Sequence, residues 1–484
     1  MISRRDSIRL IGMGGLSLLT GGVHPAGNIK EGKPNIILIF IDDMGWPAVS
    51  CYGNRWIKTG NIDRLAREGM RFTDAYVTPQ CTPSRASLLT GQHTARNKMW
   101  HVIGYYGYPF AKVTEPEYRL QLPRETYTLG KALKDNGYRT ALLGKWHLTN
   151  NEDGYYTYLK DSGKLHYGFD YVNPMTDPTE YQSYGDKGVD FLTDEAIGFM
   201  KRNRERPFFI YLSHHTVHNP VLAPKENIKH LLYKGFPDRG IHNATYIAAL
   251  QHLDDSVGRL LDKVDELGMA ENTIVLFLSD NGGVDSLFDN SPLRAGKGSP
   301  YEGGIRVPFI VRWPGTVFPG SVCETPVHVV DIYPTLLEMA GGSMKQDHIL
   351  DGRNIVPLLK QKGHWDRDAL YWYMPLYDHL WGATPAAVIR EGDYKLIDFF
   401  GDYIDIELGF KYIPEGRLEL YNVREDLGET NDLYRSMPEK VQSMRTKLHA
   451  WIKSMGESIP GENPYYDPKR ALEKITDKKD LPGH

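Results

Sequence analysis

Four apolar runs, each seven residues long, constrain the fold of this chain more than any other feature. They are rich in β-branched and aromatic residues and alternate little with polar ones. A continuous apolar run of this length is typical of a strand whose two faces are both buried, as in a parallel sheet. The four runs span Asn35–Ile41, Tyr138–Gly144, Pro207–Ser213 and Thr273–Ser279. We therefore expect them to form strands at the centre of one sheet.

Helical patterns lie between these runs. Residues 128–136 form a predicted helix, which Gly137 ends. Between the third and fourth runs, apolar residues recur at helical spacing, namely Leu253, Val257, Leu260, Leu261, Val264 and Leu267. Strands that alternate with helices predict an α/β fold, in which helices flank a large, doubly wound, mostly parallel sheet.

Polar side chains follow every one of the four runs. In chain order these are Asp42 and Asp43, then Lys145 and His147, then His214, His215 and His218, and finally Asp280 and Asn281. In doubly wound sheets, ligands bind beyond the carboxyl ends of the strands. The sequence therefore predicts that all four groups meet in one shared site.

The pattern changes after about Leu359, and a chain of 484 residues is long enough for two unequal domains. Short apolar segments within residues 369–421 predict a smaller antiparallel sheet. A helix that carries Val441, Met444, Leu448, Trp451 and Ile452 on one face follows and is expected to pack on that sheet. We assign residues 30–360 to a catalytic α/β domain and residues 361–484 to a C-terminal α+β subdomain.

The N-terminal residues 1–29 look like a targeting segment. Ser3-Arg4-Arg5 precedes a short apolar run, Leu10–Leu19, and this arrangement resembles a twin-arginine export signal of bacteria, with Ser7 departing from the usual apolar residue. The run is too short to span a membrane, so no stable membrane insertion is expected. The net charge of −4, without a polybasic block, gives no indication of nucleic-acid binding.

Cys81 begins a segment that predicts a helix with reactive chemistry at its start. Pro83 suits the first turn and Gly91 suits the end. Cys81 would then lie at the positive end of the helix dipole, and Arg85, one turn along, could hold a negative group beside it. The chain has only three cysteines, which rules out a disulfide framework.

Cys81-Thr82-Pro83-Ser84-Arg85, closed by Leu89-Thr90-Gly91, resembles the signature of type I sulfatases of the alkaline phosphatase superfamily. The resemblance continues in order from about Pro34 to Leu433. It implies that a maturation enzyme oxidises Cys81 to formylglycine (3-oxoalanine), a built-in cofactor. The hydrate of this aldehyde would then attack the sulfur of a sulfate ester.

The same resemblance assigns a metal site. Three carboxylates and an amide suit a hard divalent cation. In the family, the positions of Asp42, Asp43, Asp280 and Asn281 hold a calcium ion, which also contacts the modified cysteine, here Cys81. We therefore expect calcium, in preference to magnesium.

Further motifs carry the remaining catalytic roles. Gly144-Lys145-Trp146-His147 resembles the family's Gly-Lys-x-His, in which the lysine meets the sulfate and the histidine takes a proton from the aldehyde hydrate. His218 and Lys297 resemble the residues that bind the sulfate or protonate the leaving oxygen. Lys145, His218 and Lys297 are thus the predicted substrate-binding residues, and Arg85 completes the predicted catalytic set with Cys81 and His147. His214 and His215 are expected to pack or to support.

Two further sets of residues are expected near the site. Glu302 and Arg306 are predicted to form a structural ion pair. The candidates for substrate specificity are His93, Arg96, Trp100, His101, His379 and Trp381, each of which also has a structural interpretation.

Taken together, these features predict an exported, periplasmic or secreted hydrolase of sulfate monoesters, acting on sulfated glycans. One alternative is a phosphonate or phosphate ester hydrolase of the same superfamily. A second is a catalytically silent relative that binds glycans, and a third is a transferase that uses the same site.

Overall fold

A computed structural model describes residues 32–484, except residues 104–106, 155–157, 174–184, 379–380, 382, 401–402, 406–410, 414–416, 472, 474, 476–478 and 480–484. The predicted export signal and His379 lie outside the described residues. Among the described residues, no helix has both the length and the apolar character needed to cross a membrane. Cys51, Cys81 and Cys323 are all free thiols.

The described residues form a large mixed sheet with the strand order β4-β3-β5-β1-β6-β7-β2-β8, in which β9 also pairs with β2. The strands are β1 (Asn35–Ile41), β2 (Met70–Tyr76), β3 (Arg139–Gly144), β4 (Tyr171–Val172), β5 (Phe208–Ser213), β6 (Thr273–Ser279), β7 (Arg306–Arg312), β8 (Ser321–Cys323) and β9 (Val327–His328). Strands β3, β5, β1 and β6 are parallel neighbours, and β7 is antiparallel to both β6 and β2. The four predicted strands therefore lie together, as expected.

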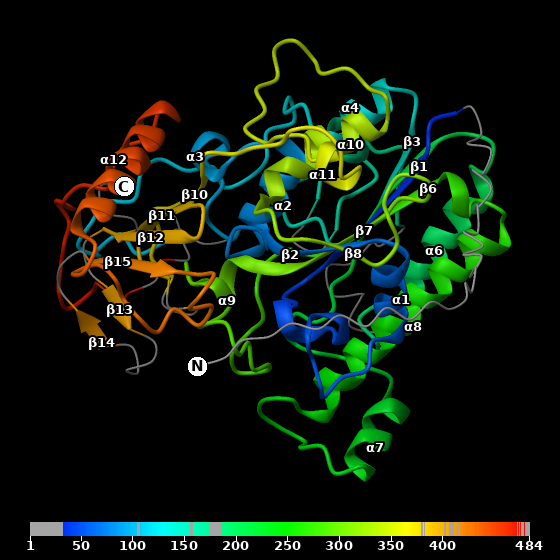
Figure 1. The fold of residues 1–484 in the computed structure, drawn as a ribbon, viewed down its shortest axis with the longest axis horizontal. Helices are drawn as coiled ribbons and strands as arrows, with labels where there is room; N and C mark the ends of the chain where they lie inside the picture. The colour runs from blue at the N-terminus through cyan, green and yellow to red at the C-terminus, as the bar shows by residue number, and fades with distance from the viewer. Residues whose placement is uncertain are drawn as a thin grey trace, which may run out of the picture.

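Helices cover both faces of this sheet (Figure 1). The α-helices are α1 (Gly60–Glu68), α2 (Cys81–Thr90), α3 (Thr94–Asn97), α4 (Leu129–Asp135), α6 (Val189–Arg202), α7 (Lys225–Tyr233), α8 (Ala244–Glu266), α9 (Glu302–Ile305), α10 (Ile332–Met339), α11 (Val356–Leu359) and α12 (Pro438–Ser454). Short 3-10 turns are η1 (Trp46–Ala48), η2 (Ser50–Tyr52), η3 (Lys164–Tyr167), η4 (Ala270–Asn272) and η5 (Val329–Asp331). Helices α2, α4 and α10 pack on one face, and α1, α6 and α8 pack on the other.

Strand β1 shows why the apolar runs do not alternate. Ile36, Leu38 and Phe40 enter the core beneath α2, α4 and α10, while Ile37 and Ile39 enter the core beneath α1, α6 and α8. Because both faces are covered by helices, successive residues of the strand are buried on opposite sides. The prediction of a doubly wound α/β sheet is confirmed.

The C-terminal part forms a second, four-stranded antiparallel sheet in the order β10-β11-β12-β15. Its strands are β10 (Leu370–Met374), β11 (Ala386–Glu391), β12 (Tyr394–Phe399) and β15 (Arg417–Asn422), and a separate pair is formed by β13 (Tyr403–Asp405) and β14 (Lys411–Ile413). Helix α12 packs on this sheet through its predicted apolar face, of which Val441, Met444, Leu448 and Ile452 are buried and Trp451 is partly buried. The second sheet and its helix are thus confirmed, whereas the boundary between residues 360 and 361 stays a prediction.

Candidate active site

The register of the central strands brings their carboxyl ends to one edge of the sheet. Phe40 of β1 lies beside Ser213 of β5, which in turn lies beside Gly144 of β3. On the other side of β1, Ile41 lies beside Ser279 of β6. The residues that follow these four strands therefore start from neighbouring positions, as the sequence predicts.

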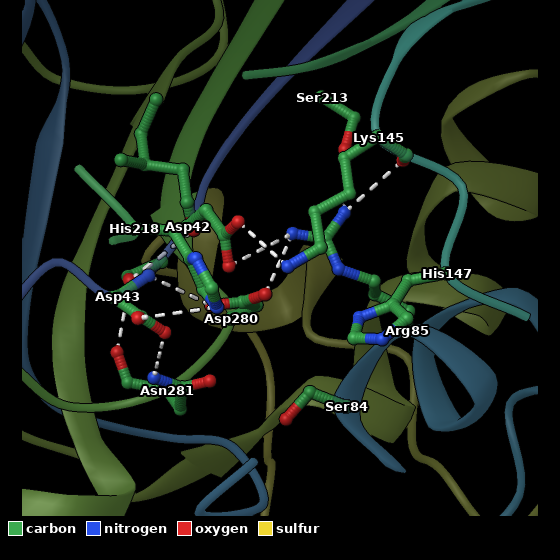
Figure 2. Close-up of polar contacts among 12 residues, drawn as sticks. Asp42, Asp43, Ser84, Arg85, Lys145, His147, Ser213, His218, Asp280 and Asn281 are labelled. Carbon is green, nitrogen blue, oxygen red and sulfur yellow. Dashed lines mark hydrogen bonds and ion pairs between the residues drawn. The ribbon is translucent and has the colours of Figure 1, made fainter. Parts of the chain in front are cut away.

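The carboxylates after β1 and β6 form one buried cluster (Figure 2). Asp43 accepts a hydrogen bond from the Asn281 amide at 2.9 Å, and its own backbone N–H donates to Asp280 Oδ1 at 3.1 Å. Asp42 lies beside them, and none of the four side chains is more than 2% exposed. All four predicted metal ligands are therefore in one place.

Cys81 faces this cluster as the first residue of α2, the predicted helix, which Gly91 ends in a left-handed conformation (φ 65°). Its sulfur lies within 4.8 Å of ligand atoms of Asp42 and Asp280, and likewise of Asp43 and His218. Burial raises the pKa of the Cys81 thiol. The positive charges of Lys145 and Lys297 oppose this increase but do not cancel it. The unmodified cysteine is thus held as a neutral thiol, a poor nucleophile.

Arg85 ties the Cys81 helix to the strand ends. It is fully buried and donates to Asp280 Oδ2 at 2.6 Å, to Ser213 Oγ at 2.5 Å and to the Lys145 carbonyl at 3.2 Å. The negative group that Arg85 holds is therefore Asp280. A charge-assisted bond of this kind orients a carboxylate as well as stabilising it.

Two buried lysines neutralise the other two carboxylates. Lys145 Nζ lies 2.6 Å from Asp42 Oδ2, and Lys297 Nζ lies 2.7 and 2.9 Å from the two oxygens of Asp43. Burial alone would lower the pKa of Lys145, but Asp42 raises it above its ordinary value. Asp43 has the same net effect on the pKa of Lys297. Both lysines remain cations at neutral pH.

Two histidines lie at the edge of the cluster. Burial and the nearby Lys145 hold the pKa of His147 well below its ordinary value, so its imidazole is neutral and able to accept a proton. His218 Nδ1 donates to the Asn219 carbonyl at 2.6 Å, which leaves Nε2 on the side of Asp43, 3.9 Å from Oδ2. Burial also lowers the pKa of His218.

Lys187 is a residue at this site that the sequence analysis missed. It is 1% exposed and donates to the Pro220 carbonyl at 2.9 Å and to the His218 carbonyl. Burial lowers the pKa of Lys187 to about 8. No motif or periodic pattern surrounds it in the sequence, so only its tertiary position identifies it as a support for the His218 loop.

The donor set of the cluster fits a hard divalent cation. Asp42 Oδ1 and Asn281 Oδ1 are buried and accept no hydrogen bond from the described part of the chain. Burial raises the pKa of Asp280 to about 7, against the opposing charge of Arg85. A cation bound to these oxygens would supply the missing partners and would displace that proton.

Most of the residues proposed for specificity are packed inside the protein. His93 contacts the rings of His328 and Trp451, Arg96 binds Asp351 at 2.8 Å, Trp100 packs on Tyr373, and His101 Nε2 lies 2.5 Å from Glu115. Trp381 differs, because its ring lies 4.7 Å from Lys297 Nζ and is partly exposed. The predicted ion pair of Glu302 and Arg306 is present at 2.6 Å.

The chain belongs to the sulfatase family and is a sulfuric ester hydrolase. The model of the sulfatase family matches residues 34–343, and the model described as N-sulphoglucosamine sulphohydrolase, C-terminal, matches residues 296–457. The resemblance to type I sulfatases is thereby confirmed.

Three similar proteins illustrate the relationship. A sulfatase from Formosa agariphila is 32% identical, over 87% of this chain and 89% of that protein. The N-acetylgalactosamine-6-sulfatase of Homo sapiens is also 32% identical, over 70% of this chain and 68% of that protein. Among solved structures, the crystal structure of Ps i-CgsB in complex with k-i-k-neocarrahexaose superposes with a TM-score of 0.70, over 91% of this chain and 96% of that chain. The sequence identity of the two chains is 27%.

Proposed function

We propose that this sulfatase hydrolyses sulfate monoesters on glycans, with a formylglycine made from Cys81 and a bound calcium ion. The observation that carries the proposal is the position of Cys81. Cys81 is the first residue of α2, and its sulfur lies within 4.8 Å of carboxylate oxygens of the residues that follow β1 and β6. A group at this position can share a cation with those carboxylates and at the same time face a substrate.

The charges of the site support an anionic ester as substrate. Three carboxylates, Asp42, Asp43 and Asp280, are balanced by three cations, Lys145, Lys297 and Arg85. A divalent cation would therefore leave the site with two positive charges in excess. That excess matches the charge of a sulfate monoester together with an ionised nucleophile. Charge placed in advance in this way is usually the largest contribution to catalysis.

The proposed cation and the proposed aldehyde at position 81 would together supply an activated nucleophile. Held by Asp42, Asp43, Asp280 and Asn281, the cation would act as a Lewis acid, and the hydrated aldehyde at position 81 would supply one hydroxyl to attack sulfur and a second through which sulfate is released.

The chain's own residues have complementary tasks. Lys145 and Lys297 bind the sulfate oxygens, and Arg85 holds Asp280 in place. His147, which is neutral, accepts a proton from the residue at position 81. Lys297, which is a cation, gives a proton to the departing alkoxide oxygen; His218 can do so instead when Nε2 is protonated as well as Nδ1.

The glycan assignment has separate support. Ps i-CgsB was crystallised with k-i-k-neocarrahexaose, and the human relative is named for N-acetylgalactosamine 6-sulfate chemistry. Trp381 offers a partly exposed aromatic face beside Lys297, a surface suited to the apolar face of a sugar ring. With residues 1–29 as an export signal, the enzyme would be matured by a formylglycine-generating enzyme and would act in the periplasm or outside the cell.

The decisive experiment is sulfate release from a panel of defined sulfated saccharides, after mass spectrometry of the Cys81 peptide has established the aldehyde. Cys81→Ala should be inactive with an unchanged fold. No release from any saccharide, despite the aldehyde, would contradict the glycan assignment. Parallel assays with aryl phosphates and phosphonates test the alternative within the superfamily, which faster turnover of those esters would favour.

A further inference from the structure

A buried cluster of ion pairs joins the large sheet to the C-terminal sheet. It contains three carboxylates and three cations, which are Asp74, Glu302 and Glu429 on one side and Arg306, Arg390 and Lys395 on the other. Glu302, Lys395 and Glu429 are at most 1% exposed. A buried charge costs much free energy unless it is paired, so the balance of three against three is a requirement of this packing.

Lys395, on β12 of the C-terminal sheet, is the link between the two carboxylates that face it. Its Nζ lies 3.0 Å from Glu302 Oε1 and 2.7 Å from Glu429 Oε1. Glu429 Oε2 in turn accepts a hydrogen bond from the backbone N–H of Glu302 at 2.7 Å. The C-terminal part of the chain therefore holds the side chain of Glu302 through Lys395 on β12 and its backbone through Glu429, which lies between β15 and α12.

Glu302 begins α9, at the end of the loop that delivers Lys297 to the active site. Within this loop, the Gly303 N–H donates to the Arg294 carbonyl at 2.9 Å, and the Gly304 carbonyl accepts from Gly282 at 3.0 Å. Gly282 directly follows Asn281, one of the four residues proposed to bind the metal ion. In Figure 1, α9 lies beside the C-terminal sheet, so the loop is anchored from that side.

A second contact from the C-terminal part holds the other end of the same loop. Arg294 donates to the Tyr421 hydroxyl at 3.0 Å and to the Glu429 carbonyl at 3.3 Å. Its guanidinium also lies 3.9 Å from the centre of the Tyr301 ring. Residues 294–304 are thus fixed at both ends by groups that lie more than 90 residues further along the chain.

We propose that Lys395 is a positioning residue for catalysis, which holds Glu302 and thereby sets the place of Lys297 beside Asp43. The catalytic role of Lys297 rests on the proposed function, whereas its position beside Asp43 is observed in the structure. Without Lys395, Glu302 and Glu429 would face each other without a cation between them. Burial already raises the pKa of Glu429 to about 7, so without Lys395 this carboxyl would take up a proton, and neither glutamate would be tied to a cation on β12. Without that tie, we expect α9 to shift from the C-terminal sheet and to carry the Lys297 loop with it.

The test is Lys395→Met, which keeps the length of the side chain and removes its charge. Activity is measured on a series of aryl sulfates whose leaving phenols differ in acidity. A displacement of Lys297 by about 1 Å should reduce kcat/KM by about 100-fold. Because Lys297 stabilises the leaving oxygen, the loss should be greatest for the least acidic phenols. A merely structural defect would lower the rates of all substrates by the same factor.

A charge-compensated variant and a surface variant complete the design. In Lys395→Met with Glu429→Gln, one charge of each sign is removed, and the new amide can donate to Glu302. This double variant should regain part of the lost activity. If Lys395→Met does not fold, the position of Lys297 and the dependence on the leaving group are measured in the double variant instead. Lys447→Met, which removes an exposed lysine paired with Glu391 in the same subdomain, should behave as the unaltered enzyme.

A crystal structure of the variant provides a readout that needs no turnover. Lys297 Nζ should no longer lie within hydrogen-bond distance of Asp43. An unmoved Lys297, or an equal loss of rate for every leaving group, would overturn the proposal. If the unaltered enzyme released sulfate from no ester, the proposed function would fail, and the position of Lys297 in the variant would still decide the role of Lys395.

Discussion

Arg85 is the side chain that joins the Cys81 helix to three strand ends. Its partners come from β5, from the residue after β3 and from the residue after β6. Asp280 has two functions in this arrangement, because it balances Arg85 and completes the oxygen cluster. A change at Asp280 should therefore affect both stability and cation binding.

Asp280→Ala should lose the bound cation and at least about 100-fold in activity, since a preorganised charge at the reacting centre disappears. It should also lower the free energy of unfolding by about 3 kcal/mol or more, because Arg85 is left buried without its closest partner. Metal analysis and thermal unfolding check the two effects. Asp289→Asn, an exposed carboxylate in the following loop, serves as the control; a full metal content in Asp280→Ala would exclude Asp280 as a ligand.

Strand β3 shows how one glycine allows two strand ends to approach. Gly144 has φ 100°, and a Cβ atom there would lie 2.0 Å from the Ser213 carbonyl oxygen. Gly137, before the same strand, has φ 87° but no atom within 4 Å of a Cβ. Substitution of Gly137 by alanine would thus introduce backbone strain alone, whereas the same substitution at Gly144 would introduce both strain and a steric clash.

Gly144→Ala should lower the free energy of unfolding by at least about 2 kcal/mol, because strain and a clash with backbone act together. It should also reduce activity, since Lys145 is the next residue. Gly137→Ala should cost only about 1 kcal/mol and leave activity intact. Denaturant unfolding and turnover measure both; equal effects of the two substitutions would contradict this account of β3.

Helices α6 and α8 are joined by His252, whose Nε2 lies 3.2 Å from Asp186 and 3.5 Å from Asp190. Burial alone would lower the pKa of His252, but Asp186 and Asp190 raise it above its ordinary value. A raised folded-state pKa stabilises the protein below the unfolded-state pKa, and this stabilisation is lost as the pH rises through the folded-state value.

His252→Gln should therefore destabilise the protein more at pH 6 than at pH 8. Thermal unfolding of both proteins at the two pH values measures the difference. Asp255, which also raises the pKa, and Arg259, which binds Asp190, remain in place in the variant. A destabilisation that is equal at both pH values would show that the His252 charge contributes nothing.

Over the whole molecule, cation binding and folding should be coupled. The cluster draws its oxygens from segments more than 230 residues apart, so a cation that binds it stabilises only the folded chain. At a concentration 100 times its Kd, such a ligand stabilises by about 2.7 kcal/mol. Chelation should lower Tm, and calcium should restore it at lower concentration than magnesium. An unchanged Tm after chelation would contradict a cation in this cluster.

Four central strands of the large sheet, the helix that begins at Cys81 and the strand ends where the site lies could be predicted from the amino-acid sequence, whereas β2, β4, β7, β8 and β9 were not predicted. These features are local: a continuous apolar run means two buried faces, and a glycine in a left-handed conformation ends a helix. The order of polar residues after the strands was equally readable, because parallel strands bring their carboxyl ends to one edge.

Apart from the ion pair of Glu302 and Arg306, the pairing of the buried charges became visible only in the folded structure. The pairing of Arg85 with Asp280, the support of the His218 loop by Lys187 and the bridge of Lys395 between Glu302 and Glu429 all join distant segments. None has a periodic or motif signal, because a buried ion pair depends on the packing of whole elements and not on the neighbours of either residue. The sequence motifs thus identified the residues of the active site, and the packing of the two sheets determined which other residues hold those side chains in position.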